Sequence, residues 1–291
     1  MRLFKKKCDI QGFIADLHDK KQEIGFVPTM GALHAGHISL VQAARQHSDF
    51  TVCSIFVNPT QFNDPKDLEK YPRTIEKDLQ LLELHGCDAV FYPDVEEIYP
   101  SGTAHPPHYD LGHLEYILEG KYRPGHFQGV AHVVSRLFYT MDPDHVFFGQ
   151  KDLQQCKVIE QLIALNPDFN RIRMHTVPTL REPSGLAMSS RNTRLSAEEL
   201  QKAPAIYQTL TYLKEQLTAG DLSSLLETAR QRLVAEGFRP DYISIANTHT
   251  LEACTRWDSQ TPVTGLIAAF LGAVRLIDNM ELHPGTRLNT F

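Results

Sequence analysis

The residues Gly25-Phe-Val-Pro-Thr-Met-Gly-Ala-Leu-His-Ala-Gly-His37 join a short apolar run to a glycine-spaced turn. The apolar run at 24–28 predicts a strand, and the helical spacing of Ile38, Val41 and Ala44 predicts a helix directly after the turn. A buried strand that passes through a glycine turn into a helix is typical of a parallel sheet covered by helices. We therefore take this segment as the first strand–turn–helix unit of such a sheet.

The rest of the first two-thirds of the chain repeats this alternation. Apolar residues at helical spacing, such as Ile75, Leu79 and Leu82, separate short β-branched runs at 51–57, 89–92, 146–148 and 171–177. The run Ser54-Ile-Phe-Val57 is apolar on both sides, which favours a sheet buried on both faces. The sequence predicts an α/β fold with a Rossmann-like, doubly wound parallel sheet.

The pattern changes near residue 180. A loop with Pro and Gly at 178–192 precedes two helical patterns, at 197–217 and 222–236, and strand-like runs at 241–246, 264–270 and 273–277. Helices followed by strands are typical of an α+β domain. We expect two domains, residues 1–178 and a smaller C-terminal α+β domain at 179–291. A segment rich in Pro, Gly, His and Tyr at 93–113 predicts a long irregular loop, which is more often functional or mobile than part of a core.

Composition excludes several classes of protein. The 291 residues are 42% hydrophobic and 22% charged, which fits a folded protein, and the net charge of −6 offers no basic surplus for nucleic acid. No apolar run reaches the length of a membrane span, and the start of the chain has no secretory signal pattern. The five cysteines are an odd, widely spaced set without a CxxC pair, which favours a reducing cytoplasm over a disulfide framework or a zinc ribbon.

His34 and His37 are the first candidates for chemistry. Three residues apart at a helix start, they lie on one face, where the helix dipole and free backbone N–H groups favour anions. Gly31 and Gly36 would let a phosphate approach the backbone. The structural alternative is a capped helix with two surface histidines. A zinc pair is weaker, because no third ligand stands at a suitable spacing.

Three further segments carry polar groups near expected strand ends or between the domains. Residues 57–62 include two amides after the second strand, although such a segment is often only a turn. Residues 148–152 place Lys151 where it would neutralise a phosphate, while Asp152 has the alternative role of an N-cap. Residues 185–192 put two hydroxyls and a guanidinium on a glycine-started loop, which has the alternative role of a hinge.

Together these segments resemble one family. The motifs PTMGALHAGH (28–37), VNPTQF (57–62), LEGKYRPGHFQGV (118–130), FGQKDLQQ (148–155) and GLAMSSRN (185–192) stand in the order and at the spacings of the pantothenate synthetases (pantoate–β-alanine ligases). These belong to the nucleotidyltransferases with an HxGH signature. The resemblance covers almost the whole chain and implies ATP-dependent condensation of pantoate with β-alanine through a pantoyl adenylate, with release of pyrophosphate and AMP.

The resemblance also implies roles for individual residues. His34, His37 and Lys151 would be catalytic, with His37 as general acid and Lys151 on the phosphates. The nucleotide would contact Met30, Gly31, Ala32, Leu33, His34, Ala35, Gly36, His37, Gly149, Gln150, Lys151, Asp152, Leu180, Met188, Ser189, Ser190 and Arg191. Pantoate and β-alanine would contact Asn58, Gln61, Arg123, His126 and Gln155. It further implies Mg²⁺ with ATP, a homodimer, a C-terminal domain that acts as a lid, and no nucleic-acid or membrane partner; we assign no metal ligand in the protein.

Two other functions remain open on the residues alone. Another nucleotidyltransferase, which passes a nucleotide to a phosphate, would keep the two histidines but would need neither the Gln61/Gln155 pair nor an amine site. A nucleotide-sensing module would bind ATP without chemistry. A dehydrogenase is disfavoured because no GxGxxG follows the first expected strand.

Overall fold

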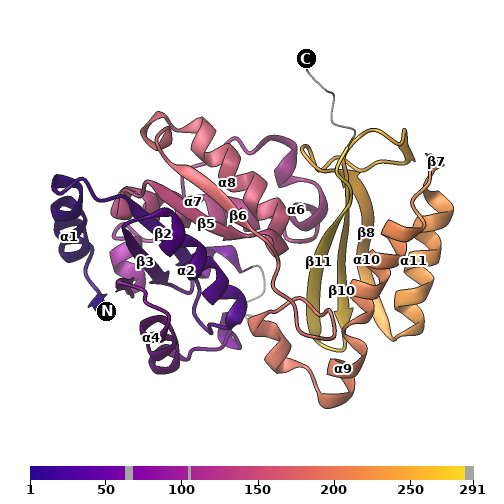
Figure 1. The fold of residues 1–291 in the computed structure, drawn as a ribbon, viewed down its shortest axis with the longest axis horizontal. Coiled ribbons are helices and arrows are strands. Elements are labelled where there is room, and N and C mark those ends of the chain that lie inside the picture. Colours follow the sequence, from indigo (N-terminus) through magenta and orange to yellow (C-terminus); the bar gives the residue numbers. More distant parts are fainter. Residues whose placement is uncertain (63–67, 104–105, 286–291) are drawn as a thin grey trace. The chain divides into compact units, whose positions relative to one another are not determined.

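The computed structural model describes residues 1–62, 68–103 and 106–285, and the chain divides into two compact units, Met1–Thr179 and Leu180–Phe291 (Figure 1). The strands of the first unit are β1 Arg2–Phe4, β2 Ile24–Thr29, β3 Phe50–Ile55, β4 Ala89–Phe91, β5 His145–Gly149 and β6 Arg173–Val177. Its α-helices are α1 Lys7–Asp19, α2 Ala35–His47, α4 Ile75–Leu84, α5 Val95–Ile98, α6 Leu118–Tyr122, α7 His126–Met141 and α8 Leu153–Leu165. Short 3-10 turns are η1 Pro59–Gln61, η2 Gly112–Glu115, η3 Gln150–Asp152 and η4 Pro167–Phe169.

The strands of the first unit form one parallel sheet in the order β1-β4-β3-β2-β5-β6. From β2 the chain winds outward through β3 and β4, and then returns to the other side of β2 through β5 and β6. The prediction of a doubly wound α/β sheet is confirmed. The strand order reverses between β2 and β5, and an open α/β sheet binds its ligands beyond the carboxyl ends of the strands at such a point.

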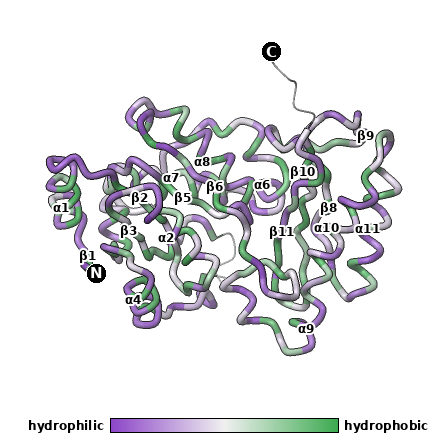
Figure 2. Tube along the Cα trace, viewed as in Figure 1, coloured by the Kyte–Doolittle hydropathy of each residue, from purple (hydrophilic) through white to green (hydrophobic). Residues whose placement is uncertain are grey.

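Helices cover both faces of this sheet, as Figure 1 shows. On one face, Val41 of α2 and Leu82 of α4 share a buried cluster with Val27, Cys53 and Phe147 of the strands. On the other face, α7 packs with α1 and α8 and contacts β2. Figure 2 shows hydrophobic and hydrophilic residues alternating along α1, whose inner side buries three residues, Ile10, Ile14 and Leu17. Burial on both faces explains the continuous apolar runs of the central strands.

Two features of the first unit differ from the expectation. The edge strand β1 has only three residues, two of them exposed, so it shows no alternation in the sequence. The segment 93–113, expected to be irregular, includes α5 and the start of η2, and it buries Tyr99, which is 2% exposed. Residues 104 and 105 of this segment lie outside the described residues.

The second unit has an antiparallel sheet in the order β11-β10-β8, which confirms the prediction of a C-terminal α+β arrangement. Its elements are η5 Ser190–Arg194, α9 Ala197–Lys202, α10 Ala205–Glu215, β7 Gly220–Asp221, α11 Ser223–Ala235, β8 Phe238–Asn247, β9 Arg256–Trp257, β10 Val263–Leu271 and β11 Val274–His283. The expectation of one helix over 197–217 is wrong. Pro204 separates α9 from α10, because proline has no backbone N–H to donate to the preceding turn. Among the described residues, no helix combines the length and apolar character that a membrane span requires.

Candidate active site

Most of the predicted site residues of the first unit follow the carboxyl ends of three neighbouring strands, whereas Arg123 and His126 lie at the end of α6 and the start of α7. The turn 30–34 and the start of α2 follow β2, Asn58 and η1 follow β3, and η3 follows β5. These segments therefore meet at the edge where the strand order reverses.

His34 caps α2 and fixes the orientation of both histidine rings. Its Nδ1 accepts the Gly36 N–H at 3.1 Å, and the Nδ1 of His37 accepts the His34 N–H at 3.3 Å. The ring centroids lie 4.1 Å apart. Because Nδ1 accepts a hydrogen bond in both rings, the proton of each neutral imidazole lies on Nε2. The alternative interpretation, in which the histidines cap the helix, is therefore correct as far as their Nδ1 atoms are concerned. Capping leaves the Nε2–H group of each ring to act as a donor.

The environment keeps both imidazoles neutral at pH 7. Burial, and then the positive charge of Lys151, lower the pKa of His34 to about 4. Burial, then His34, then Lys151 lower the pKa of His37 to about 3. Loss of solvent and a nearby positive charge both disfavour an imidazolium. The pair therefore offers hydrogen-bond donors rather than formal positive charges.

The backbone N–H groups of the turn are already bonded within the chain. The Gly31 N–H donates to Thr29 Oγ1 at 3.2 Å, and those of Ala32 and Leu33 donate to the Asp78 carboxylate, each at 2.9 Å. The His34 N–H is taken by His37. The backbone N–H groups of residues 31–34 are therefore not free to bind an anion, whereas the sequence predicted such groups at the start of the helix. Any contact that residues 31–34 make to an anion therefore has to come from their side chains.

Asn58 is buried, and its amide is occupied by the chain itself. Its Nδ2 donates to Gln61 Oε1 at 3.2 Å and to the Gly129 carbonyl at 3.1 Å. Its Oδ1 accepts the Tyr99 hydroxyl at 2.8 Å and the Thr60 N–H at 3.2 Å. The geometry makes Asn58 a residue that orients Gln61. Sequence reasoning missed Tyr99, which comes from the segment expected to be an irregular loop.

Gln61 connects the ends of β2 and β3 to the start of α7. Its side-chain Nε2 contacts Met30 Sδ at 2.8 Å. Its backbone carbonyl accepts a hydrogen bond from His126 Nδ1, also at 2.8 Å. Arg123 Nη1 donates to His126 Nε2 at 3.1 Å, which places the proton of that ring on Nδ1. The structure thus brings together Met30, Asn58, Gln61, Arg123 and His126.

The segment after β5 supplies a cation and two different glutamines. Lys151 is close enough to lower the pKa of both site histidines. Asp152 occupies the N-cap position of α8 but makes no side-chain capping bond. Gln154 is buried and donates to the carbonyls of Leu114 and Ile117. Gln155 is half-buried, and its amide makes no hydrogen bond to the residues that the structure describes.

In the second unit, Leu180 and residues 188–191 lie in one hydrogen-bonded loop. The Met188 N–H donates to the Leu180 carbonyl at 3.0 Å, and Ser189 Oγ accepts the Arg191 N–H at 3.3 Å. Sequence reasoning missed the anchor of this loop, Arg181. Its guanidinium makes a bidentate ion pair with the buried Asp278, from Nη1 to Oδ2 at 2.5 Å and from Nη2 to Oδ1 at 3.0 Å. A bidentate pair fixes the orientation of the guanidinium and also neutralises its charge.

Comparison with known proteins places the chain in a family. The family described as Pantoate-beta-alanine ligase matches residues 2–281. The pantothenate synthetase of Pseudomonas fluorescens is 46% identical over 98% of this chain and 99% of its own length. The structure of pantothenate synthetase from Thermus thermophilus aligns with a TM-score of 0.88 and 40% identity, over 98% of this chain and all (100%) of that one.

A second solved structure comes from Francisella tularensis. This pantoate–β-alanine ligase, described as complexed with β,γ-ATP and β-alanine, aligns with a TM-score of 0.82 and 36% identity, over 97% of this chain and 98% of that one. Similarity of this kind extends through both units rather than through one of them. The chain therefore belongs to the pantoate–β-alanine ligase family.

Proposed function

We propose that the protein condenses pantoate with β-alanine at the expense of ATP, through a pantoyl adenylate. The observation that carries this proposal is the pair of neutral imidazoles with Lys151 beside them, at the point where the strand order reverses. Family membership gives the substrates. Their functional groups match a site rich in neutral donors and amides.

The first step brings like charges together. A pantoate carboxylate oxygen attacks the α-phosphorus, the bond from that phosphorus to the bridging oxygen breaks, and pyrophosphate leaves. Negative charge on the phosphoryl oxygens has to be met by fixed donors and cations. In the proposed site, His34 and His37 donate from Nε2, and Lys151 contributes an ammonium. A neutral imidazole with a pKa of about 3 favours hydrogen-bond donation by His37 over the role of a charged general acid.

The second step transfers the acyl group to the amine. The β-alanine nitrogen attacks the acyl carbon, AMP leaves with the bonding electron pair, and the new amide nitrogen loses a proton. We assign Gln61 and Gln155 to pantoate, and Arg123 and His126 to the amine side. Asn58 donates to Gln61 Oε1, and Gln61 Nε2 donates to Met30 Sδ, so the orientation of the Gln61 amide is fixed and its second amide hydrogen would serve the substrate. This assignment makes Asn58 a positioning residue.

We further propose that Mg²⁺ arrives on the triphosphate as MgATP. Within the described ranges, no group of three or more His, Cys, Asp or Glu side chains is arranged to hold a metal ion. Mg²⁺ commonly keeps several waters and binds through substrate phosphates, so a protein cage is not required. The ion would neutralise charge on the leaving pyrophosphate.

The remaining proposals rest on the resemblance. Residues 188–191 and Leu180 would contact the nucleotide, residues 179–291 would act as a lid over residues 1–178, and two copies would form a homodimer. We also propose a cytoplasmic location, which the five free thiols support because a reducing compartment preserves them.

ATP–pyrophosphate exchange tests the proposed function. With pantoate present and β-alanine absent, labelled pyrophosphate is expected to enter ATP, because adenylation is reversible. Addition of β-alanine should then convert the intermediate to pantothenate and AMP. Exchange that needs no pantoate, or pyrophosphate release only with a phosphorylated acceptor, would contradict the proposal and favour another nucleotidyltransferase. ATP binding without either reaction would favour a nucleotide sensor.

A further inference from the structure

Asp78 is a buried carboxylate that the proposed chemistry does not use. It lies on α4 and is 2% exposed. Its Oδ2 accepts the Ala32 N–H at 2.9 Å, and its Oδ1 accepts the Leu33 N–H at 2.9 Å and the Thr74 hydroxyl at 3.0 Å. One carboxylate thus binds two successive N–H groups of the turn that precedes His34.

This turn has an unfavourable backbone conformation. Gly31 has φ +79° and Ala32 has φ +50°. The left-handed region costs little for glycine but is disfavoured for alanine. A Cβ added at Gly31 would lie 3.1 Å from Asp78 Oδ2, so glycine is also what lets the carboxylate approach. The two hydrogen bonds from Ala32 and Leu33 compensate for the strain in the turn.

The charge of Asp78 makes a role in direct ligand binding unfavourable. A buried carboxylate behind the turn that precedes the two histidines would repel a triphosphate, and it occupies two N–H donors that a ligand could otherwise use. Burial of a carboxylate is costly unless it is well hydrogen-bonded. The benefit of Asp78 must then lie in the backbone geometry that it enforces. This geometry sets the start of α2, where backbone N–H groups hold the Nδ1 atoms of His34 and His37.

We propose that Asp78 is a positioning residue for the reaction: it locks the turn 31–33 and thereby aims the Nε2–H groups of His34 and His37 at the phosphates. The catalytic part of this inference rests on the proposed function, whereas the geometric part does not. Asp78 itself touches no reacting atom in this account. An amide cannot replace it fully, because two N–H donors require two acceptor oxygens.

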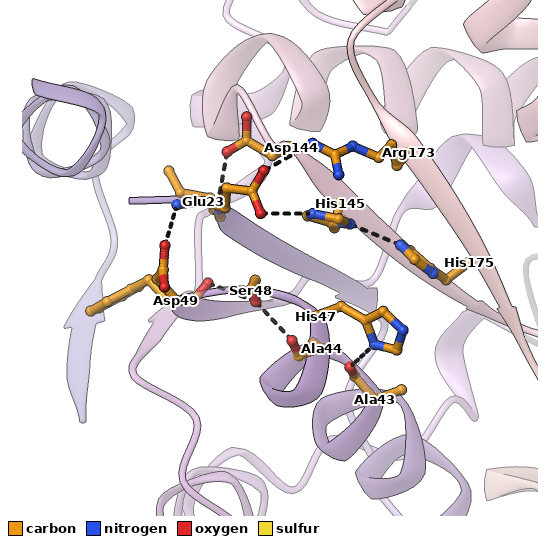
Figure 3. A network of polar contacts seen from close by, with 12 residues as sticks. Glu23, Ala43, Ala44, His47, Ser48, Asp49, Asp144, His145, Arg173 and His175 are labelled. Atoms are coloured by element: carbon orange, nitrogen blue, oxygen red, sulfur yellow. Dashed lines mark hydrogen bonds and ion pairs between the residues drawn. The ribbon is translucent and has the colours of Figure 1, made fainter. Parts of the chain in front are cut away.

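The Asp78→Asn variant tests the proposal, with Asp144→Asn as a matched control. Asp144 also accepts a backbone N–H of β2, that of Ile24 at 2.8 Å, but at the amino end of the strand (Figure 3). For Asp78→Asn we expect kcat of pantoate-dependent ATP–pyrophosphate exchange to fall about 10- to 100-fold, with KM for pantoate within about threefold, the scale of a misaimed transition-state donor. Asp144→Asn should lower the melting temperature by a similar amount and leave kcat within about twofold.

A second measurement does not depend on activity. In ¹⁵N-histidine NMR spectra, Asp78→Asn should shift the ring signals of His34 and His37, whereas Asp144→Asn should leave them unchanged. Unshifted ring signals in Asp78→Asn, or a kcat within twofold of wild type, would overturn the proposal. A wild-type protein without exchange activity would refute the proposed function, and the ring signals would still decide the geometric claim.

A milder variant covers the case in which Asp78→Asn does not fold. Thr74→Val removes only the hydroxyl that donates to Asp78 Oδ1. It should lower kcat about threefold and shift the same two ring signals in the same direction. Thr74→Val with wild-type kcat and unshifted ring signals would overturn the proposal.

Discussion

Two histidine pairs stand at opposite ends of the central sheet. His34 and His37 follow the carboxyl end of β2. His145 begins β5, and its Nδ1 lies 2.8 Å from Nε2 of His175 on β6, in the network that Figure 3 shows. The Nε2 of His145 lies 3.3 Å from Glu23, which also pairs with Arg173 at 2.9 Å.

The hydrogen-bond partners distinguish these pairs better than their acidity does. Burial lowers the pKa of His175 as it lowers those of His34 and His37. A perturbed pKa alone would therefore select both ends as functional sites. At the carboxyl end, backbone N–H groups bind one nitrogen of each ring and leave Nε2–H as a donor. At the amino end, both ring nitrogens of His145 face other side chains, which is the arrangement of a structural network.

The largest effect is expected from His34→Asn. Asparagine is a favourable N-cap, so its Oδ1 should still accept the Gly36 N–H, while the Nε2–H donor is lost. We expect single-turnover adenylation to slow by about 10²-fold or more, the scale of one lost transition-state donor, with the melting temperature nearly unchanged. Lys151→Ala should show a similar loss. A change of less than about threefold would remove His34 from the catalytic residues.

A smaller effect is expected on stability as the pH falls. The unfolded chain protonates histidine near pH 6.5, whereas folded His34 does so only near pH 4. Between these values the unfolded state binds more protons, so the stability present above pH 6.5 is lost as the pH decreases. At pH 5 the loss from His34 should be about 1–2 kcal/mol. Urea unfolding at pH 7 and pH 5 should show a smaller loss in His34→Asn than in wild type; equal losses would contradict the lowered pKa.

The smallest effect on rate is expected at the amino end of the sheet. His145→Asn keeps a hydrogen-bonding group for His175 but loses the contact to Glu23 and part of a buried ring. Adenylation should stay within about threefold of wild type, while the melting temperature falls by a few degrees, as for other partly emptied core positions. A tenfold loss of rate without a change in melting temperature would show that the two ends are coupled.

The sequence predicts this site unevenly, for physical reasons. The strand–turn–helix units were predictable, because periodicity and glycine spacing are local properties. The roles of the motif residues were predicted only through their resemblance to a family. Asp78 was not predictable, because it contacts Ala32 from 46 residues away and appears in the sequence as one polar position of an amphipathic helix. The role of Asn58 depends likewise on Tyr99, 41 residues further along the chain. Hydrogen bonds between distant segments leave no periodic pattern.

The central claim is that His34 and His37 are neutral donors whose protons lie on Nε2. Histidine-selective ¹⁵N NMR, titrated with MgATP, tests it most directly. We predict an unprotonated Nδ1 in both rings, no titration between about pH 5.5 and 8, and a shift of both Nε2 signals on MgATP binding that His145 and His175 do not share. An imidazolium or an Nδ1–H form of either site histidine at pH 7, or equal shifts in both pairs, would contradict the account.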